Sequence, residues 1–482
     1  MARDLVEVRL ESQAFPCEHI QIHKLSGREK ISQIFDLELT IASSDPDEPS
    51  VDAMAGADAT IVFLREGDEL RRMHGMIAEV TEMLETEVTT RVYRLRFVPR
   101  VFRSTLIETQ EVFQQLTVPE IIAQKLDLVG IGANDREFRL LGSYPKLEFV
   151  VQFAECDLAF ISRLAEHAGI SFFFVHDEER DAIVFTDHPG GFQSAPEGRM
   201  ATFQPRGEQR EVYRIEGRTR LIPAAYVVQD YNYRKPELDV TGSVESALGF
   251  AGGVVEFGSH HKTPEAGKAL ARIRAEEREA TRHVYEGQSD LGWFGAGMRV
   301  EVEGHARLEQ KQLLLVEVVH HIVQAVGVFG GKVEERYTNT FSAIDATLTF
   351  RPPRITPKPR IHGLLTGVVE QEPEAAIAGH AVLDEDGRYT IRFLFDTAPV
   401  GQLKASRPVR MLQPHAGPDY GIHFPLKPGV EVLLAFVNGD PDRPLIVGAV
   451  PNPETPSPVV RKSALKNRIK TVSGILIEMK DT

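Results

Sequence analysis

Short stretches of alternating or continuous apolar residues recur along most of the chain and favour β-structure. They are rich in β-branched and aromatic residues and are bounded by Gly, Asp or Pro, as strands usually are. Three of them are predicted as single strands, and the longest as one strand or a strand pair: Ala59–Leu64, Arg91–Pro99, Ile170–His176 and Lys311–Val323. The pattern therefore predicts a mainly β protein.

Three segments instead show helical periodicity and carry helix end signals: Thr117–Gly130, Cys156–Gly169 and Thr263–Val284. A capping-box spacing, a proline in the first turn or a glycine just past the end marks these segments. In the second helix we expect one apolar face, formed by Leu158, Ile161, Leu164 and Ala165. In the third we expect Leu270 and Ile273 to form the apolar side and the charged remainder to face solvent.

The clearest boundary is the proline-rich stretch Arg351–Gly363, which predicts a stiff, extended linker. An all-β unit follows, from about Ile361 to Pro453. It contains a predicted hairpin over His380–Asp396 and a second one over Gly429–Pro453, joined to each other by further short strands. About five strands in roughly 90 residues are typical of a small closed barrel of the OB type.

The last stretch, Lys466–Thr482, again alternates polar and apolar residues, with Ser473–Gly474 as a break. One or two strands at a terminus have no core of their own. We expect these strands to be covered by another chain, to be mobile, or to continue in a longer protein.

Composition restricts the classes of function. The 482 residues suggest about three domains, and the net charge of −15 argues against nucleic acid or an anionic membrane as the main partner. Cys17 and Cys156 are too few for a disulfide framework or a cysteine-rich zinc site. The N-terminus lacks the apolar core of a secretory signal, and the sequence has no run of about 18 apolar residues.

Catalytic motifs are missing from the sequence: it holds no H-E-x-x-H, no G-x-S-x-G and no G-x-x-x-x-G-K-[ST]. Two histidine pairs, His260–His261 and His320–His321, are candidate metal ligands. Neighbouring residues on a strand point to opposite faces, so one pair does not readily hold one ion. We interpret these histidines as packed or solvated, although a site that combines the two pairs stays conceivable.

Carboxylates cluster at three places: Asp384–Asp386, Asp440 with Asp442, and Glu276, Glu277 and Glu279. A glycosidase would need two of them facing each other across a cleft. Each cluster falls on a predicted turn or exposed helix, so we interpret them as solvated charge. The turn Asn438–Pro444 is interpreted as structural, with a local pair between Asp442 and Arg443.

An OB-type barrel also suggests binding of single-stranded nucleic acid. Between residues 361 and 456, however, seven Lys or Arg stand against twelve Asp or Glu. The stretch from Arg461 is basic but short. We therefore expect no nucleic-acid partner.

Several motifs, in the same order, resemble the VgrG family, the spikes of type VI secretion systems. These motifs are "GDPDRPLIVGAVPNP", "LDEDGRYTIRFLFD", the helix and strand of Gln152–Glu178, Asp230–Pro236 and Tyr337–Asp345. The resemblance extends over essentially the whole chain. It implies a phage-hub-like region of β-barrels with a few helices over 1–350, in two subdomains, and a linker over 351–360. An OB-fold over 361–455 and the neck and first strands of a trimeric β-helix over 456–482 would follow.

The resemblance also implies partners and a location. The chain would form a homotrimer, sit on an Hcp-like tube, contact the baseplate, and carry a PAAR-type tip protein or effector cargo. It would be assembled in the cytoplasm and then secreted or injected by a contracting sheath, with the membrane only a puncture target. No enzymatic activity, catalytic residue, cofactor or metal is implied.

Alternatives remain open at this point. The family commonly has a His-Trp pair where this chain has Leu394–Phe395, so a phage tail or an extracellular contractile injection system is a second interpretation. A secreted hydrolase with an accessory barrel is a third. The missing nucleophile motifs and the turn positions of the carboxylates argue against a hydrolase.

Overall fold

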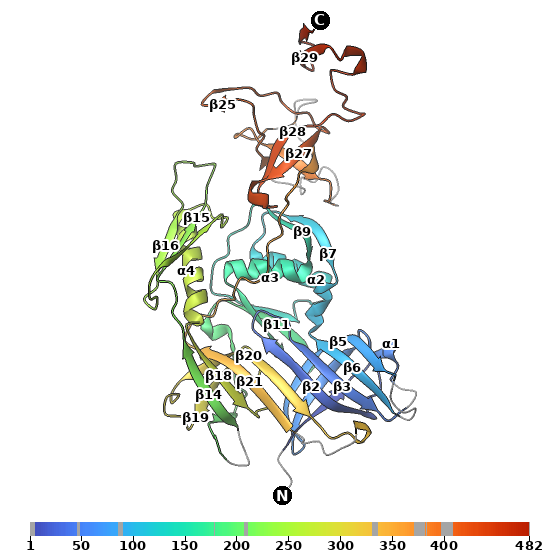
Figure 1. The fold of residues 1–482 in the computed structure, drawn as a ribbon, viewed down its shortest axis with the longest axis vertical. Helices are drawn as coiled ribbons and strands as arrows, with labels where there is room; N and C mark the ends of the chain where they lie inside the picture. The colour runs from blue at the N-terminus through green and yellow to red at the C-terminus, as the bar shows by residue number, and fades with distance from the viewer. Residues whose placement is uncertain are drawn as a thin grey trace. The chain divides into compact units, whose positions relative to one another are not determined.

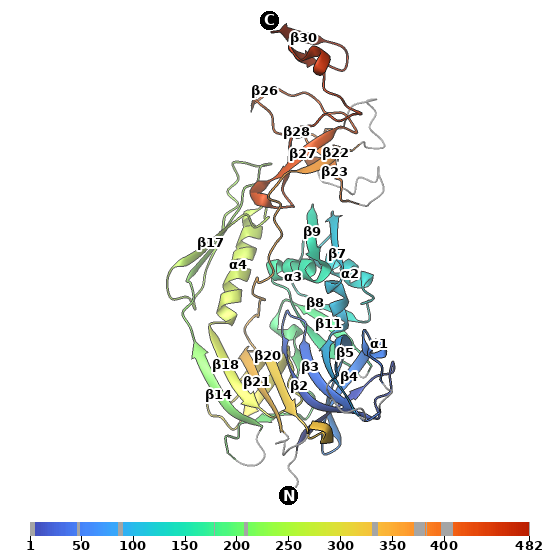
Figure 2. The same ribbon diagram turned by 45° about the vertical axis from the view of Figure 1, so that its right-hand side comes forward.

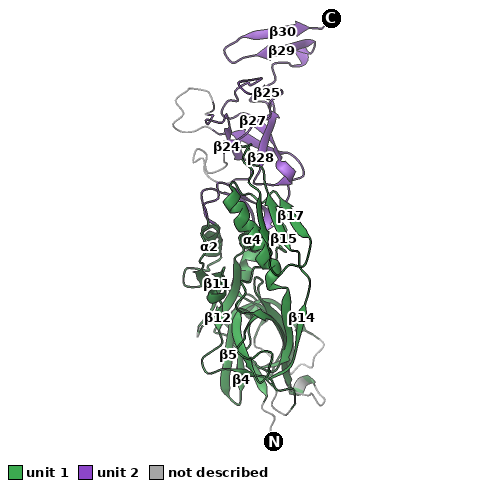
Figure 3. Ribbon diagram, turned by 90° about the vertical axis from the view of Figure 1, so that its left-hand side faces the viewer, with its two compact units in different colours: residues 1–107, 118–144, 156–357 green, residues 108–117, 145–155, 358–482 purple. Residues whose placement is uncertain are grey.

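The computed structural model describes residues 5–45, 49–84, 90–177, 179–206, 211–329, 336–370, 381, 383–396 and 408–481. Contacts divide the chain into two compact units, shown in different colours in Figure 3. Unit 1 comprises residues 1–107, 118–144 and 156–357, and unit 2 comprises 108–117, 145–155 and 358–482. Both units are built mainly of strands, which confirms the predicted class.

The main feature of unit 1 is a large mixed sheet (Figure 1). Among the described residues it contains thirteen strands, ten of them in the order β1-β4-β5-β6-β3-β2-β20-β21-β18-β14, with β12, β13 and β19 beside them. Their bounds are β1 (Val6–Glu11), β2 (Ile20–Lys30), β3 (Asp36–Ser43), β4 (Asp58–Arg65), β5 (Asp68–Met83), β6 (Arg91–Val98), β12 (Gln193–Ser194), β13 (Ala201–Thr202), β14 (Val212–Thr219), β18 (His283–Ser289), β19 (Met298–Glu303), β20 (Gln312–Val323) and β21 (Arg336–Asp345). The predicted strands β4, β6 and β20 are confirmed, and β20 is one continuous strand.

Smaller elements complete unit 1. Two three-stranded sheets have the orders β10-β11-β8 and β16-β15-β17. Their strands are β8 (Arg136–Arg139), β10 (Ser171–His176), β11 (Asp181–Thr186), β15 (Ala225–Gln229), β16 (Gly242–Glu245) and β17 (Gly253–Phe257), and the helices are α1 (Val51–Met54), α2 (Val118–Leu128), α3 (Asp157–Ala168) and α4 (Pro264–Ala280). β10 lies where the sequence predicted it.

The side chain of Gln324 joins two strands that the sheet itself leaves apart. In the described pairing, β1 and β2 are not neighbours, although they end the six-strand run β1-β4-β5-β6-β3-β2. Val8 N–H donates to Gln324 Oε1 at 2.7 Å, and Gln324 Nε2 donates to the carbonyl oxygens of Val8 at 3.2 Å and Ile22 at 2.7 Å. One carboxamide therefore replaces a peptide unit and satisfies backbone groups on both strands.

We predict that Gln324→Ala lowers the free energy of unfolding by about 1–3 kcal/mol, because it leaves these backbone groups without a partner. Urea denaturation of the full chain measures this loss. The matched control is Gln312→Ala, at the exposed start of β20, where the side chain bonds to Glu301 and to no other residue that the structure describes. Equal losses in the two variants would contradict the role given to Gln324.

A buried polar network fastens four strands of the large sheet. Glu29 on β2 accepts two hydrogen bonds from Arg71 on β5, at 2.6 and 2.7 Å, and contacts Nε2 of His320 on β20 at 2.7 Å. His320 Nδ1 lies 2.8 Å from the hydroxyl of Tyr337 on β21. Burial alone would raise the pKa of Glu29, but the Arg71 charge and the hydrogen bonds from His320 and Arg71 outweigh it and lower the pKa. The carboxylate is therefore held ionised inside the sheet.

His176 lies beside this network on β10 and is partly buried. Its Nδ1 accepts the N–H of His74 at 3.1 Å, and its Nε2 is buried without a hydrogen-bond partner among the described residues. Burial, helped by the Arg71 cation, lowers the pKa of His176 to about 3. The folded protein therefore excludes a proton that the unfolded chain binds near pH 6.5.

We predict that His176 makes the protein less stable as the pH falls from about 6.5 towards 3. In this window the unfolded state binds the proton and the folded state does not, so the free energy of unfolding should fall by up to about 1.4 kcal/mol per pH unit. His176→Gln should remove this part of the slope in urea titrations between pH 6 and 4. His321→Gln, at an exposed position of β20, is the control, and an unchanged slope in His176→Gln would contradict the prediction.

The three predicted helices are confirmed, but two bury different faces from those expected. Leu158 of α3 is only partly buried, and the charged Asp157, Arg163 and Glu166 are buried with its apolar residues. Lys125 of α2 pairs with Asp157 at 3.1 Å, and both side chains are almost fully buried. Contacts on several sides of α3 explain the difference, because a single-face pattern describes a helix with one covered side.

Helix α4 packs through small residues rather than through Leu270 and Ile273, which are only partly buried. Thr263 caps the helix as predicted, and α4 lies along the β16-β15-β17 sheet in both views (Figures 1 and 2). A Cβ added to Gly242 of β16 would lie 1.9 Å from the backbone of Gly267 in α4. The two glycines permit this close approach, so the short side chains of α4 meet the sheet.

Unit 2 is built around a five-stranded sheet with the order β24-β23-β22-β27-β28. Its strands and their neighbours are β7 (Glu108–Phe113), β9 (Val150–Cys156), β22 (Leu365–Val369), β23 (Tyr389–Phe393), β24 (Pro408–Val409), β25 (Ala416–Gly417), β26 (Tyr420–Gly421), β27 (Glu431–Phe436), β28 (Pro444–Ala449), β29 (Lys466–Lys470) and β30 (Leu476–Lys480). The predicted hairpin β27–β28 is confirmed. In the predicted hairpin over residues 380–396, the second strand is β23. Where the first strand was predicted, the described residues form one β-bridge, between Leu383 and Tyr389. Residues 380 and 382 lie outside the described residues.

The core of unit 2 includes side chains from a distant part of the sequence. Phe149 and Val151 pack with Ile391, Leu434 and Ile446 in one apolar cluster. They come from the segments 108–117 and 145–155, which contain β7 and β9 and interrupt the sequence of unit 1. We call these two segments the excursion. Neither compact unit is therefore continuous in sequence.

Candidate assembly surface

The C-terminal hairpin β29–β30 presents an apolar face with nothing packed on it among the described residues. The antiparallel register pairs Asn467 with Met479 and Ile469 with Ile477. Cross-strand partners share a face of the hairpin, so Ile469, Ile477 and Met479 lie together. Their exposed fractions are 45%, 55% and 58%. Figure 2 shows the hairpin near the C-terminus.

The opposite face of this hairpin is charged. Arg468 and Lys466 on β29 contact Glu478 on β30 at 2.7 and 3.0 Å. Hydrogen bonds from Lys466 and Arg468 lower the pKa of Glu478. The hairpin is therefore amphipathic, with Lys466, Arg468 and Glu478 on one face and Ile469, Ile477 and Met479 on the other.

An isolated two-stranded hairpin is at best marginally stable in water. This one offers no buried apolar area of its own, since every residue of β30 is exposed. Further exposed apolar residues precede or join the strands: Val460, Leu465, Val472 and Ile475. Contiguous exposed apolar surface of this kind is typical of a protein–protein contact. We take the apolar face of β29–β30 as the candidate assembly surface.

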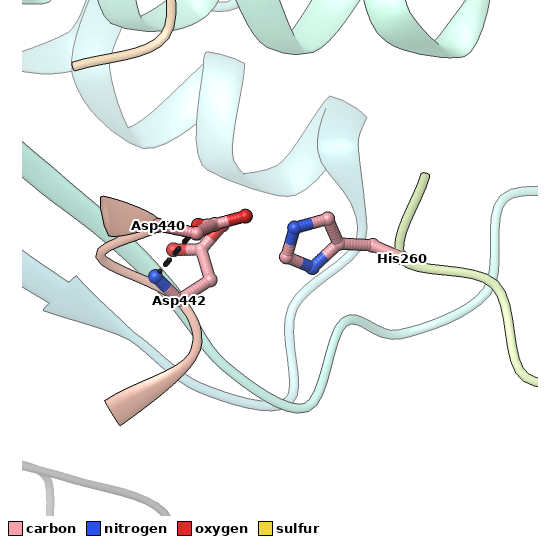
Figure 4. A group of neighbouring side chains, drawn as sticks. All are labelled: His260, Asp440 and Asp442. Atoms are coloured by element: carbon pink, nitrogen blue, oxygen red, sulfur yellow. Dashed lines mark hydrogen bonds between the residues drawn. The ribbon is translucent and has the colours of Figure 1, made fainter. Parts of the chain in front are cut away.

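The turn Asn438–Pro444, in which the sequence suggested a local pair of Asp442 and Arg443, is closed by hydrogen bonds of its own, such as Arg443 N–H to the carbonyl oxygen of Asp440 at 2.9 Å. The carboxylates of the turn also bind other segments of unit 2. Lys358 Nζ lies 2.6 Å from Asp440 Oδ1 and 2.6 Å from Asp442 Oδ2. Asp442 Oδ1 also accepts the backbone N–H of Val151 at 2.7 Å. Figure 4 shows the two aspartates and the 3.0 Å bond from Asp442 N to Asp440 Oδ1. His260, drawn there as well, belongs to unit 1.

The candidate histidines have separate environments. His320 is buried in the polar network and His321 is exposed, as adjacent strand residues should be. His261 is buried and its Nε2 lies 2.6 Å from the carbonyl oxygen of Val240. His260 is exposed, and its backbone N–H donates to Asp230 at 2.6 Å. The structure does not bring the two pairs together in one cluster.

The candidate carboxylates mostly face basic side chains. Asp384 and Asp386 contact Arg388 at 2.6 and 3.2 Å, and Glu385 between them is exposed. On α4, Glu276 contacts Arg351 at 2.8 Å, Glu277 lies 3.7 Å from Arg354, and Glu279 accepts from Ser246 at 2.6 Å. These groups act as ion-pair partners within their own unit. No helix among the described residues has both the length and the apolar character needed to cross a membrane.

Two family matches agree with this architecture. Residues 28–326 match the phage tail baseplate hub (GPD) family. Residues 380–450 match the type VI secretion system/phage-baseplate injector OB domain, which identifies the five-stranded sheet of unit 2 as an OB-fold. The first match spans more than half of the sequence, so the chain belongs to the phage tail baseplate hub family.

Curated relatives narrow the comparison to VgrG spikes. The chain is 28% identical over 460 residues to the type VI secretion system spike protein VgrG1b of Pseudomonas aeruginosa, covering 94% of this chain and 61% of that protein. It is 30% identical to VgrG4b of the same organism, over 91% of this chain and 55% of that protein. The actin cross-linking toxin VgrG1 of Vibrio cholerae is 28% identical, with 83% of this chain and 36% of the toxin covered. The chain spans about half to two thirds of the length of these Pseudomonas relatives.

Solved structures share the fold. An Escherichia coli protein described as a type VI secretion component similar to the T4 tail proteins gp27 and gp5 matches with a TM-score of 0.67 and 23% identity, over 92% of this chain and 100% of that one. A chain of the Francisella PdpA–VgrG complex matches with a TM-score of 0.62 and 9% identity, over 99% of this chain and 83% of that one.

Proposed function

We propose that this chain is the hub and spike component of a contractile injection machine, of the type VI secretion class. It would puncture the target envelope mechanically and carry tip or effector proteins. Membership of the baseplate hub family and the similarity to VgrG spikes over more than 90% of the chain support this function. The function requires no catalytic residue, cofactor or metal, and we infer that this part of the protein is not an enzyme.

The observation that carries the assembly proposal is the uncovered apolar face of β29–β30. We propose that three copies of the chain cover these faces by winding their C-terminal strands into a shared β-helix. The domains would then be a hub over about 1–350, a linker over 351–360, an OB-fold over 361–455 and the first strands of the β-helix over 456–482. The amphipathic pattern supports this, because the charged face can stay in water while the apolar faces meet.

The same proposal assigns partners and a route. The homotrimer would sit on a tube of Hcp-like rings within the baseplate, and a PAAR-type protein or effector would cap or load the spike. Assembly would take place in the cytoplasm, followed by secretion or injection by the sheath, with no nucleic-acid partner. A phage tail hub is the second candidate, because the family that matches residues 28–326 is the phage tail baseplate hub family.

The solution mass of the purified chain tests the assembly proposal. Light scattering over a range of concentrations should give three times the 53.7 kDa of one chain. Ile469→Ser combined with Ile477→Ser should shift this mass to that of a monomer, because it removes apolar contacts from the assembly surface. Lys470→Ser combined with Lys480→Ser changes the opposite face of the hairpin and should leave the mass unchanged.

A monomer would show that these strands alone do not hold three chains together. The same measurement on a version that adds residues after Thr482, wherever the gene continues, then decides the matter. If that longer version is also a monomer, the result contradicts the proposed homotrimer and therefore the proposed spike function.

A further inference from the structure

The turn Asn438–Pro444 contacts two of the three segments in which the chain enters unit 2, those that begin at Pro145 and at Lys358. Asp440 and Asp442 hold the ammonium of Lys358, the residue at which unit 2 resumes after unit 1. The carbonyl oxygen of Gly439 accepts the N–H of Ile361 at 2.8 Å. Asp442 also accepts the N–H of Val151 on β9, in the excursion. Asp442 is only 6% exposed, so these charge-assisted bonds are made away from water.

The preceding residues of the linker are anchored just as firmly within unit 1. Arg351 contacts Glu276 at 2.8 Å and donates to the carbonyl oxygens of Gly169 and Asp187 at 2.8 and 2.9 Å. Arg354 contacts Glu256 at 2.8 Å. Thr356 donates to Glu166 from its hydroxyl at 2.7 Å and from its backbone N–H at 3.0 Å.

These contacts leave almost no free length in the linker between the two units. Thr356 is the last residue held in unit 1 and Lys358 the first held in unit 2, with Pro357 alone between them. Two consecutive Cα–Cα steps span at most about 7 Å, and the proline ring fixes φ at its position. The composition of Arg351–Gly363 predicts a spacer, but the part between Thr356 and Lys358 is a connection of fixed length.

We propose that the turn Asn438–Pro444 is a clasp, with Asp442 as its central residue, that pins both the linker and the excursion to the OB-fold. Its mechanical role rests on the proposed spike function. A force applied to the hub would be passed to the OB-fold without lengthening the segments that connect the two. The clasp itself is a property of one chain, and its test does not require assembly or secretion.

The experiment is limited proteolysis of the full chain with trypsin, following cleavage after Arg360. Arg360 is exposed, but the N–H of Ile361 is bonded to the turn, so cleavage requires the clasp to open. Asp442→Ala should increase the cleavage rate about tenfold to a hundredfold, because it removes a buried charge-assisted contact. Hydrogen exchange at the Val151 amide should accelerate in the same variant.

Lys358→Gln breaks the same ion pairs from the other side while leaving the Val151 contact. It should increase cleavage after Arg360 without changing exchange at Val151. Asp386→Ala, which removes an exposed aspartate of another turn in unit 2, is the matched control and should change neither.

Cleavage and exchange at wild-type rates in both Asp442→Ala and Lys358→Gln would overturn the clasp, whatever the solution mass of the chain. If Asp442→Ala unfolds globally in thermal melts, Lys358→Gln and its selective pattern decide the outcome. A monomeric chain that shows the expected rates would keep the clasp and reject only the spike.

Discussion

The buried ion pair of Glu29 and Arg71 is the contact on which the large sheet of unit 1 depends. Two charges inside a protein are tolerated only when they face each other and their remaining hydrogen bonds are satisfied. Here the carboxylate also meets His320, and Arg71 donates to the carbonyl oxygen of Phe294 at 2.7 Å. Removing either charge would leave the other buried without its ion-pair partner, which is strongly destabilising. The pair therefore holds β2 against β5, and the contact of Glu29 with His320 adds β20.

Local features of the fold could be predicted from the sequence, because their causes are local. The hairpin β27–β28 follows from β-branched strands around a turn of Asn, Gly, Asp and Pro. Helix α4 begins at the position that Thr263 and Pro264 predict. The candidate assembly surface belongs to the same class. Its alternation of polar and apolar residues lies within one short hairpin, so the apolar face of β29–β30 could be predicted from the sequence as well.

Features that join distant residues could not be predicted in this way. Glu29 and His320 are 291 positions apart, and Asp442 and Val151 are also 291 apart. No pattern within a window of the sequence reports such a contact. Helix α4 shows the same limit: its Leu270 and Ile273 suggest one buried face, but the glycine contact with β16 selects another. The excursion was missed because β7 and β9 look like any other strands until their partners in unit 2 are known.

The excursion has a consequence for how such proteins can change during evolution. The chain passes between the two units at residues 107–108, 117–118, 144–145, 155–156 and 357–358. A recombination event within the proline-rich linker would exchange most of the OB-fold but would leave Phe149 and Val151 behind in the recipient gene. The transferred barrel would then meet foreign residues in its own core. Unit 2 is therefore poorly suited to exchange by recombination at the linker. Successful exchanges should transfer residues 108–155 together with the barrel, or should have their junction C-terminal to the barrel.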